Sequence, residues 1–181
     1  TGFVAEDITV SGGSVSGFSG SGSSYSFNFI PSGDGSKSVS VASGVCQDSF
    51  GNTNTASSAF TFTVDTVQPT VNLSSSVASG GSSTSSLVSM TATFSESVTG
   101  FALGDISVTN GVASNLSGSD SIYTFDVAPS ALGSVSVSVV VNAAQDSAGN
   151  QSQASSSYSW TKTSATQPVL SPTSPSVIRK E

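Results

Sequence analysis

Residues 122–141 read Ile-Tyr-Thr-Phe-Asp-Val-Ala-Pro-Ser-Ala-Leu-Gly-Ser-Val-Ser-Val-Ser-Val-Val-Val. Tyr123, Phe125 and Val127 alternate with polar residues, and the valines from Val135 to Val141 follow the same alternation. Alternation with a period of two is typical of a β-strand that buries one face. Proline, serine and glycine between the two runs indicate a turn. The stretch therefore predicts two consecutive strands of a half-buried sheet.

Outward from this stretch, five further short runs have a strand pattern, and no stretch shows a helical period over three turns. The predicted strands cover residues 71–75, 88–95, 105–109, 112–117, 121–128, 133–142 and 155–162. Seven short strands within about 100 residues, separated by turn residues, predict an all-β fold. We expect a β-sandwich of immunoglobulin-like topology, with a barrel or a jelly roll as the alternatives.

The whole pattern occurs twice. Residues 1–65 align with residues 99–163 at a constant offset of 98 without a gap, so that Gln47–Asn52 corresponds to Gln145–Asn150. A fixed period of this length indicates a copied all-β domain rather than a solenoid repeat. The predicted organisation is tandem Ig-like domains. It comprises a partial repeat over residues 1–65 that lacks its two N-terminal strands (repeat 1), a complete repeat over residues 66–163 (repeat 2), and a Pro/Ser-rich tail or linker over residues 164–181.

Repeat 1 begins where its third strand should start. A sandwich without its first two strands would expose a sheet edge and part of its core. Three interpretations stay open: the chain is a fragment of a longer protein, the strands come from another subunit by donor-strand complementation, or repeat 1 is partly disordered. If the tail is such a donor strand, the apolar residues that it would insert are Val169, Leu170, Val177 and Ile178.

The composition excludes several classes of protein. Charged residues make up 8% of the chain, compared with about a quarter in an ordinary soluble protein, and 46 serines supply the polarity instead. The net charge is −7 and Lys37 is the one basic residue among the first 161, so no nucleic acid is expected as a partner. No apolar run approaches the roughly 18 residues of a transmembrane segment. The excess of carboxylates favours either solubility or a calcium site.

The chain has no histidine and a single cysteine. The lack of histidine removes the commonest general base and the His-based catalytic triads, so we do not expect an enzyme. One cysteine cannot form an internal disulfide, and a secreted chain that avoids cysteine is typical of a bacterial surface protein. Cys46 aligns with Ala144, which predicts a small core position rather than a reactive site.

Acidic residues from separate segments are expected to meet at one end of repeat 2. In an Ig-like sandwich, the start of the first strand, the end of the second and the loop before the last lie at the same end. The residues placed there are Asp65, Glu96, Asp105, Asp146 and Asn150. Several carboxylates in one place repel unless a cation neutralises them, and calcium takes about six to eight oxygen ligands. We therefore predict a calcium site at the inter-domain junction.

Repeat 1 carries an incomplete equivalent of this site: Asp7, Asp48 and Asn52. The positions that match Asp65 and Glu96 would precede residue 1. A purely structural interpretation stays open for the loops of both repeats. Asp-x-x-Gly-Asn is also a good turn, in which Asp and Asn cap the backbone and Gly adopts a positive φ.

Five segments of repeat 2 together resemble the bacterial Ig-like repeats of large surface adhesins. These segments are Phe94–Phe101, Gly104–Gly111, Tyr123–Pro129, Gly133–Val137 and Asp146–Asn150. The resemblance covers both repeats and leaves the tail out. It implies a cadherin-like Ig sandwich, often stacked in long arrays, often stiffened by calcium and exported to the cell surface. Repeat 1 departs from the pattern because it lacks the Phe-Ser-Glu segment.

These observations favour a structural or adhesive module of a bacterial extracellular surface protein. Its partners would be neighbouring repeats and an unknown surface ligand. Two alternatives stay open: a fibre subunit in which copies of the chain exchange strands, and a carbohydrate-binding module attached to a secreted enzyme. The carbohydrate-binding module needs an exposed aromatic platform, whereas Tyr158 and Trp160 alternate along a strand as core residues do.

Overall fold

The computed structural model describes residues 2–165, and every structural statement below concerns this part of the chain. It forms two compact units, which we describe separately. The first runs to Gln68 and includes the loop Gln145–Asn150, and the second starts at Pro69. The predicted donor-strand residues of the tail lie outside the described residues. Among the described residues, no helix is long and apolar enough to cross a membrane.

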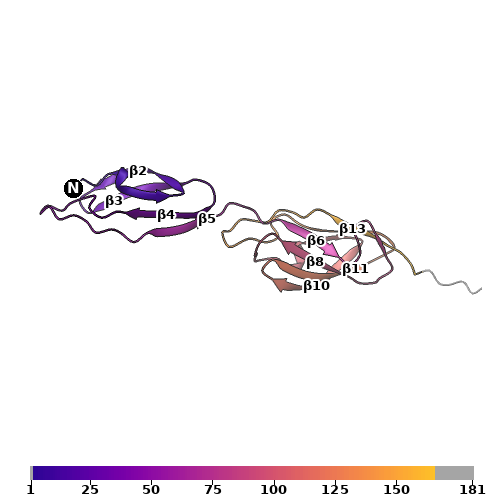
Figure 1. Cartoon of the computed structure of the whole chain (residues 1–181). Helices are drawn as coiled ribbons and strands as arrows, with labels where there is room; N and C mark the ends of the chain where they lie inside the picture. Colours follow the sequence, from indigo (N-terminus) through magenta and orange to yellow (C-terminus); the bar gives the residue numbers. More distant parts are fainter. Residues whose placement is uncertain (1, 166–181) are drawn as a thin grey trace, which may run out of the picture. The chain divides into compact units, whose positions relative to one another are not determined.

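Repeat 2 folds into two sheets of four strands each. Several of these strands are labelled in Figure 1. One sheet has the order β10-β11-β8-β6 and the other β7-β13-β12-β9, and all pairings except that of β7 with β13 are antiparallel. The strands are β6 (Val71–Ser75), β7 (Ser82–Ser83), β8 (Val88–Phe94), β9 (Ile106–Thr109), β10 (Gly111–Ser119), β11 (Ile122–Pro129), β12 (Gly133–Val139) and β13 (Tyr158–Lys162), with a short 3-10 helix η2 at Leu103–Asp105. This order reproduces the two sheets of a constant-type Ig domain, so the predicted sandwich is confirmed.

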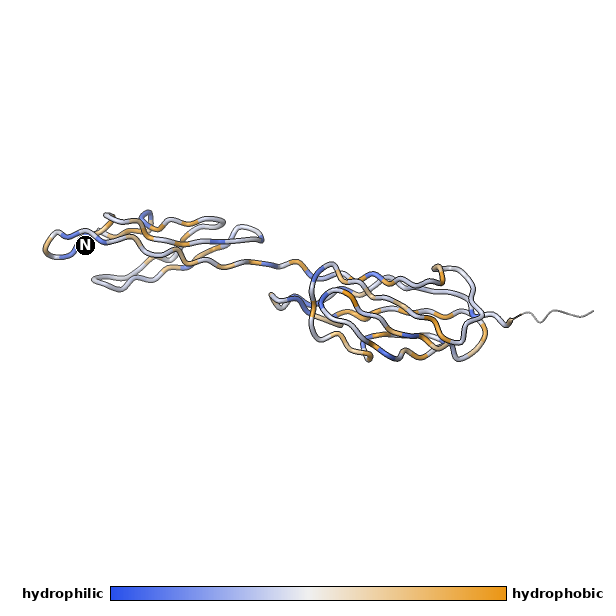
Figure 2. The backbone as a smooth tube through the Cα atoms, turned by 60° about the horizontal axis from the view of Figure 1, so that its bottom comes forward, coloured by the Kyte–Doolittle hydropathy of each residue, from blue (hydrophilic) through white to orange (hydrophobic). Residues whose placement is uncertain are grey.

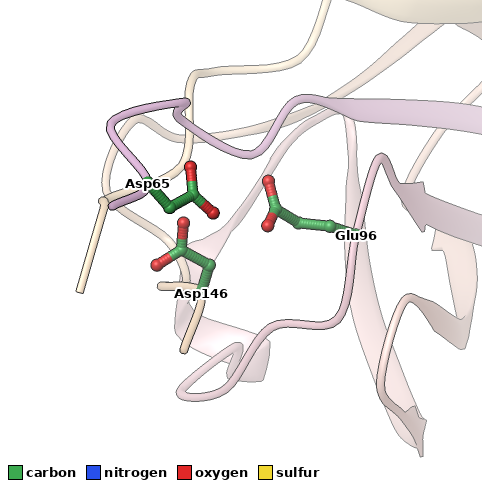
Figure 3. A group of neighbouring side chains, drawn as sticks. All are labelled: Asp65, Glu96 and Asp146. Atoms are coloured by element: carbon green, nitrogen blue, oxygen red, sulfur yellow. The ribbon is translucent and has the colours of Figure 1, made fainter. Parts of the chain in front are cut away.

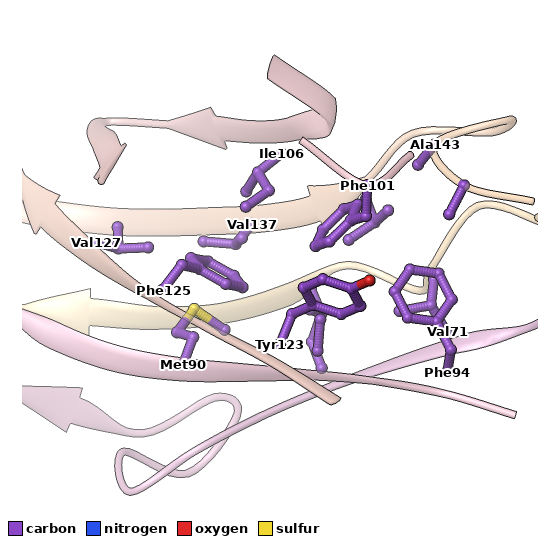
Figure 4. Packing of buried hydrophobic residues seen from close by; sticks show 14 of the residues in the cluster. Val71, Met90, Phe94, Phe101, Ile106, Tyr123, Phe125, Val127, Val137 and Ala143 are labelled. Carbon is purple, nitrogen blue, oxygen red and sulfur yellow. The ribbon is translucent and has the colours of Figure 1, made fainter. Parts of the chain in front are cut away.

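Side chains from both sheets meet in one apolar core (Figure 4). Alternate residues of β8, β11 and β12 point inward because successive side chains of a strand lie on opposite faces. The core includes Val88, Met90, Ala92, Phe94, Tyr123, Phe125, Val127, Val135, Val137 and Trp160. Full burial of one large apolar side chain stabilises the fold by about 1.5–3 kcal/mol. The core predicted from alternation is confirmed, and Trp160 belongs to it.

Several details of repeat 2 differ from the sequence prediction, among them the start of β13 at Tyr158 instead of residue 155. β7 lies between two predicted strands and pairs in parallel with β13. β9 begins at Ile106, one residue late, because the N–H of Asp105 donates to the Ala102 carbonyl (3.0 Å) and closes η2. β12 ends at Val139, since Asn142 has a φ of 61° and turns the chain away. Val141, which alternation predicted to be buried, is therefore 60% exposed.

Repeat 1 copies the later part of this sandwich, strand by strand. After the 3-10 helix η1 (Ala5–Asp7), its strands are β1 (Ile8–Ser11), β2 (Gly13–Ser21), β3 (Ser24–Pro31), β4 (Gly35–Val41) and β5 (Phe60–Val64). Each has the bounds of a repeat 2 element shifted by 98 residues. One sheet has the order β1-β4-β5 and the other holds β2 and β3. Among residues 2–64, Ile8 and Lys37 alone are buried, so the expected exposure of the core is observed.

Four positions with positive φ show how glycine and the short side chains of Asn and Asp replace one another between the repeats. In repeat 2, φ lies between 56° and 61° at Asn110, Asn115, Asp120 and Asn142. The equivalent positions in repeat 1 are Gly12, Gly17, Gly22 and Gly44, which also have positive φ. Asn and Asp tolerate the left-handed region because their short side chains form local hydrogen bonds. The two repeats therefore share turn geometry where their sequences differ.

Serine occupies many outward positions of the strands. In β12, Ser134, Ser136 and Ser138 alternate with buried valines. Most of the chain in Figure 2 is accordingly pale or hydrophobic, and strongly hydrophilic residues are sparse. The sheets thus present hydroxyl groups rather than charges to water.

Candidate metal centre

The loop between β12 and β13 is organised by Asp146. Its Oδ1 accepts hydrogen bonds from the N–H groups of Ala148 (2.8 Å) and Asn150 (2.9 Å), and its Oδ2 accepts one from the side-chain amide of Asn150 (2.8 Å). Gly149 adopts a φ of 94° between them. The loop is therefore the capped turn that the sequence allowed, and it fixes the position of the Asp146 carboxylate.

Burial and hydrogen bonding act in opposite directions on Asp146, which is 4% exposed. Desolvation raises the pKa of this carboxyl, but hydrogen bonds from Asn150, Ala148 and Gly149 outweigh it. They hold the pKa of Asp146 below its ordinary value of 3.8. The group is therefore ionised at neutral pH, which is the form that binds a cation.

Two further carboxylates point toward Asp146 (Figure 3). Asp65 follows β5 and Glu96 follows β8, and each of the three side chains offers an oxygen within 4.8 Å of the others. Asp65 and Glu96 are half-buried. We name Asp65, Glu96 and Asp146 the carboxylate cluster. Three negative groups this close repel one another, and the repulsion is stronger where water is partly excluded.

The donor set of the cluster fits calcium. Carboxylate oxygens are the preferred ligands of this hard cation, whereas zinc prefers nitrogen and sulfur. Three carboxylates supply up to about six oxygens, and water or backbone carbonyls complete the usual six to eight. Asp65, Glu96 and Asp146 are thus the residues that would hold the ion, which would neutralise their mutual repulsion.

Asn150 lies beside the cluster with its nitrogen toward the other groups. Its Nδ2 donates to the backbone carbonyl of Asp65 (3.1 Å) as well as to Asp146 Oδ2. A ligand role for Asn150 requires its oxygen, and hence rotation of the amide. That role stays a prediction; in the structure Asn150 holds Asp65 and Asp146 together.

Asp105 is not among the three residues of the cluster. Its Oδ2 accepts the N–H of Ala102 (2.8 Å) at the start of η2. The described structure thus brings together three of the four predicted carboxylates, and gives Asp105 the local hydrogen bond of a short turn. A ligand role for Asp105 stays a prediction.

Repeat 1 has the loop without the cluster. Asp48 Oδ1 accepts the N–H groups of Phe50 (2.8 Å) and Asn52 (2.9 Å), and the Asn52 amide donates to Asp48 Oδ2 (2.9 Å). That side-chain bond, aided by backbone N–H groups, lowers the pKa of Asp48. Asp7 accepts the N–H of Val4 (2.9 Å). Within residues 2–165, no group of three potential ligands includes Asp7 or Asp48.

Sequence reasoning missed one site, a groove in repeat 1 of about 490 Å³ whose lining includes Phe3, Tyr25 and Cys46. Cys46, predicted to fill a core position, is half-buried there because no strand of the described chain covers it. The groove could have been foreseen from the alignment of Cys46 with Ala144, a position that is buried in repeat 2.

Comparison with known families finds a match over both repeats. Residues 1–64 and residues 65–162 each match the family described as bacterial Ig-like domain. No curated protein matches the chain. The second match starts at Asp65, so the whole carboxylate cluster lies within one copy of the family pattern. Two adjacent matches over most of the sequence agree with two copies of the same strand order, and the chain therefore belongs to the bacterial Ig-like domain family.

Proposed function

We propose that the chain is a structural, adhesive module of a bacterial extracellular surface protein, and that calcium held by Asp65, Glu96 and Asp146 stiffens the link between its repeats. Membership of the bacterial Ig-like domain family supports a structural module. Tandem copies of such a fold would hold a ligand-binding part of the protein at a distance from the cell surface.

The observation that carries the calcium role is the carboxylate cluster. Its members come from three segments far apart in the sequence, so one ion would tie the segments together. Asp65 stands four residues before Pro69 and the start of repeat 2, where its Oδ1 accepts the N–H of Val67 (3.0 Å). Calcium bound at Asp65 would restrict the conformations of the segment between Asp65 and Pro69 and thereby stiffen the chain.

Calorimetric unfolding of the full chain, in about 2 mM calcium and in excess chelator, tests the binding. A ligand present at about 100 times its Kd stabilises the folded state by about 2.7 kcal/mol. For a domain of this size the expected increase in Tm is roughly 10 °C or more. An unchanged Tm would leave the Asp-x-x-Gly-Asn loops as plain turns.

Glu96→Gln is the sharpest variant, because it removes one charge of the cluster and leaves the Asp146 turn intact. We expect it to lose most of the calcium-dependent increase in Tm. Asp48→Asn is the control, since it also removes one carboxylate charge but lies in repeat 1, outside the cluster. A full calcium response in Glu96→Gln would exclude the cluster as the binding site.

Stiffening needs a separate measurement. Spin labels at Cys46 and at Ser130→Cys, an exposed position of repeat 2, report the distribution of distances between the repeats. Calcium should narrow this distribution in the parent chain and leave it broad in Glu96→Gln. Binding without narrowing would retain the metal site and remove its mechanical role.

Strand exchange between chains is a second candidate function. It rests on the general tendency of unpaired strand edges to accept additional strands. The carbohydrate-binding alternative gains no platform from the aromatic pair of repeat 2: Trp160 is 1% exposed, and the hydroxyl of Tyr158 donates to the Val77 carbonyl (2.6 Å).

A further inference from the structure

The turn between β3 and β4 holds the segment that follows β5. Asp34, an exposed residue of this turn, accepts two hydrogen bonds on Oδ1: one from the N–H of Thr66 (3.1 Å) and one from the Thr66 hydroxyl (2.9 Å). Hydrogen bonds to a carboxylate are stronger than those between neutral groups. The Asp34 carboxylate therefore fastens Thr66 to repeat 1, although 32 residues separate the two in the sequence.

A buried lysine fixes the turn that carries Asp34. Gly33 and Gly35 flank Asp34 with φ of 67° and 96°, so the turn contains two residues with great backbone freedom. The ammonium of Lys37, a residue 3% exposed, donates to the carbonyls of Ser32 (3.2 Å) and Asp34 (3.0 Å). These bonds satisfy a charge that would be costly to bury without partners. Asp34 therefore projects from a fixed backbone.

Repeat 2 holds the equivalent turn in another way. There Asn110 donates through Nδ2 to the carbonyls of Ala131 and Ser134, both at 3.1 Å. The equivalent of Asn110 in repeat 1 is Gly12, and the side chain of Lys37 lies beside it, because an added Cβ would be 2.7 Å from Lys37 Cδ. Lys37 thus takes the role in repeat 1 that Asn110 has in repeat 2.

The hold on the following segment, by contrast, has no counterpart in repeat 2. Three residues at the end of repeat 1 change 98 positions later: Asp34, Asp65 and Thr66 are replaced by Leu132, Thr163 and Ser164. A leucine side chain offers no acceptor, and Leu132 is 62% exposed. The carboxylate that holds the segment and the carboxylate that joins the cluster therefore occur together, after the same repeat.

Asp65 directly precedes Thr66, and its own backbone is also restrained. Its carbonyl accepts a hydrogen bond from Asn150 Nδ2 (3.1 Å), and its Oδ1 accepts the N–H of Val67 (3.0 Å). Asp34 adds a restraint on the next residue, and all of these residues belong to one compact unit. A group that is already fixed loses less conformational entropy when it binds a ligand. The hold on Thr66 therefore favours binding through Asp65.

We propose that Asp34 is a positioning residue of the calcium site: by holding Thr66, it fixes the backbone from which Asp65 reaches the ion. Asp34 is not a member of the carboxylate cluster and acts through the main chain. Lys37 supports this role because it holds the turn. The inference rests on the proposed function and deepens it, since it adds a residue that controls one of the three ligands.

The calcium affinity of the full chain, measured by isothermal titration calorimetry, tests the role of Asp34. Asp34→Ala removes the acceptor, and loss of a residue that orients a metal ligand weakens binding by about 10- to 100-fold. Asp34→Asn removes the charge but keeps an oxygen that can accept both bonds from Thr66, so it should retain most of the affinity. Asp126→Ala is the control for charge, because this carboxylate binds Asn115 (3.0 Å) and lies outside the cluster.

Amide hydrogen exchange in chelator tests the hold on Thr66 without any metal. The Thr66 amide should exchange faster in Asp34→Ala than in the parent chain, whereas the amides of β8 should not change. Equal exchange of the Thr66 amide in the two chains would overturn the inference, because the hydrogen bonds would then not restrain this residue.

Weaker calcium binding in Asp34→Ala, with most of the affinity kept in Asp34→Asn and all of it in Asp126→Ala, supports the inference. Equal affinity of Asp34→Ala and the parent chain overturns it and leaves the calcium site in place. An equal loss in Asp34→Asn or in Asp126→Ala also overturns it, because Asp34 would then act through its charge alone. No calcium binding by the parent chain overturns the proposed function, and the role of Asp34 in it as well.

Discussion

Asp146 and Asp48 are the same turn residue in two electrostatic settings. Both accept two backbone N–H groups and one asparagine amide at almost equal distances. Asp146 alone has two more carboxylates beside it. Comparison of the two residues therefore distinguishes the hydrogen bonds that form the turn from the additional carboxylates that a cation site requires.

Acid should weaken repeat 2 through Asp146. Its folded-state pKa is lower than the unfolded value of 3.8, so its contribution to stability is present above 3.8 and is lost as the pH falls through the folded value. In chelator, the Tm of the parent chain should fall more steeply below about pH 4 than that of Asp146→Asn. Asp48→Asn should affect repeat 1 alone. Equal slopes for the parent and Asp146→Asn would contradict the prediction.

Removing the ring of Phe94 should convert repeat 2 toward the state of repeat 1. Phe94 is 3% exposed and packs on Phe101 and Tyr123, so Phe94→Ala leaves a large cavity. We expect the free energy of unfolding to fall by about 3–5 kcal/mol, measured by urea titration. Val112→Ala, at a residue 64% exposed, should change it by less than about 0.5 kcal/mol. A small effect of Phe94→Ala would mean that the core tolerates an open face.

Individual residues were harder to predict than the pattern they belong to. That Asp65, Glu96 and Asp146 lie close together could be predicted, because Ig topology brings their segments to one end of the sandwich. Topology cannot say which way a side chain turns: Asp105 forms a local hydrogen bond, and Asn150 directs its amide nitrogen to Asp65 and Asp146. Cys46 was placed in a core because its partner Ala144 is small, although burial also depends on the strands that lie above it.

At the scale of single elements, β10 depends on one glycine. The register of β10 with β11 shifts between Ser114 and Ser117, and Gly118 follows with a φ of 133°. A Cβ there would lie 2.3 Å from the Ile122 carbonyl oxygen, and such contact forces the hairpin apart. Repeat 1 has Gly20 at the same position, with a φ of 136°.

Gly118→Ala should therefore lower the free energy of unfolding of repeat 2 by more than about 3 kcal/mol. Gly149→Ala is the control, because its φ of 94° is also unfavourable but nothing lies within 4 Å of the added Cβ. It should cost about 1–2 kcal/mol. Both variants are compared by denaturant unfolding in chelator. An equal loss of unfolding free energy in Gly118→Ala and Gly149→Ala would show that the close contact at Gly118 relaxes.

The strands themselves were predictable because alternation reports which face is buried. Their ends were not, because hydrogen bonds in turns decide them. Because of the short helix η2, β9 begins later than predicted. Because of the turn at Asn142, β12 ends earlier than predicted and Val141 is exposed. β7 consists of Ser82 and Ser83 and has no apolar pattern, so the sequence could not predict it. Its pairing with β13 in the structure identifies it as a strand.

At the scale of the whole molecule, the two repeats should unfold separately. Repeat 2 has a continuous core, whereas Ile8 and Lys37 are the buried residues among 2–64. Stability scales with the apolar area buried, so repeat 1 should lose its structure at lower denaturant concentration. Circular dichroism should show two transitions, and the fluorescence of Trp160, the single tryptophan, should report the second alone. Hydrogen exchange should be faster in β3 than in β11. A single cooperative transition by both probes would contradict this.

The few lysines of the chain have a consequence for its cleavage by proteases. Between residues 2 and 165 the basic residues are Lys37 and Lys162, and both lie within strands. Lys37 donates to the carbonyls of Ser32 (3.2 Å) and Asp34 (3.0 Å), and Lys162 donates to those of Thr84 and Ser85. Trypsin-like proteases cut after basic residues in segments that can leave the fold. Residues 2–165 therefore offer such an enzyme two cleavage sites, and cleavage after Lys162 requires repeat 2 to open.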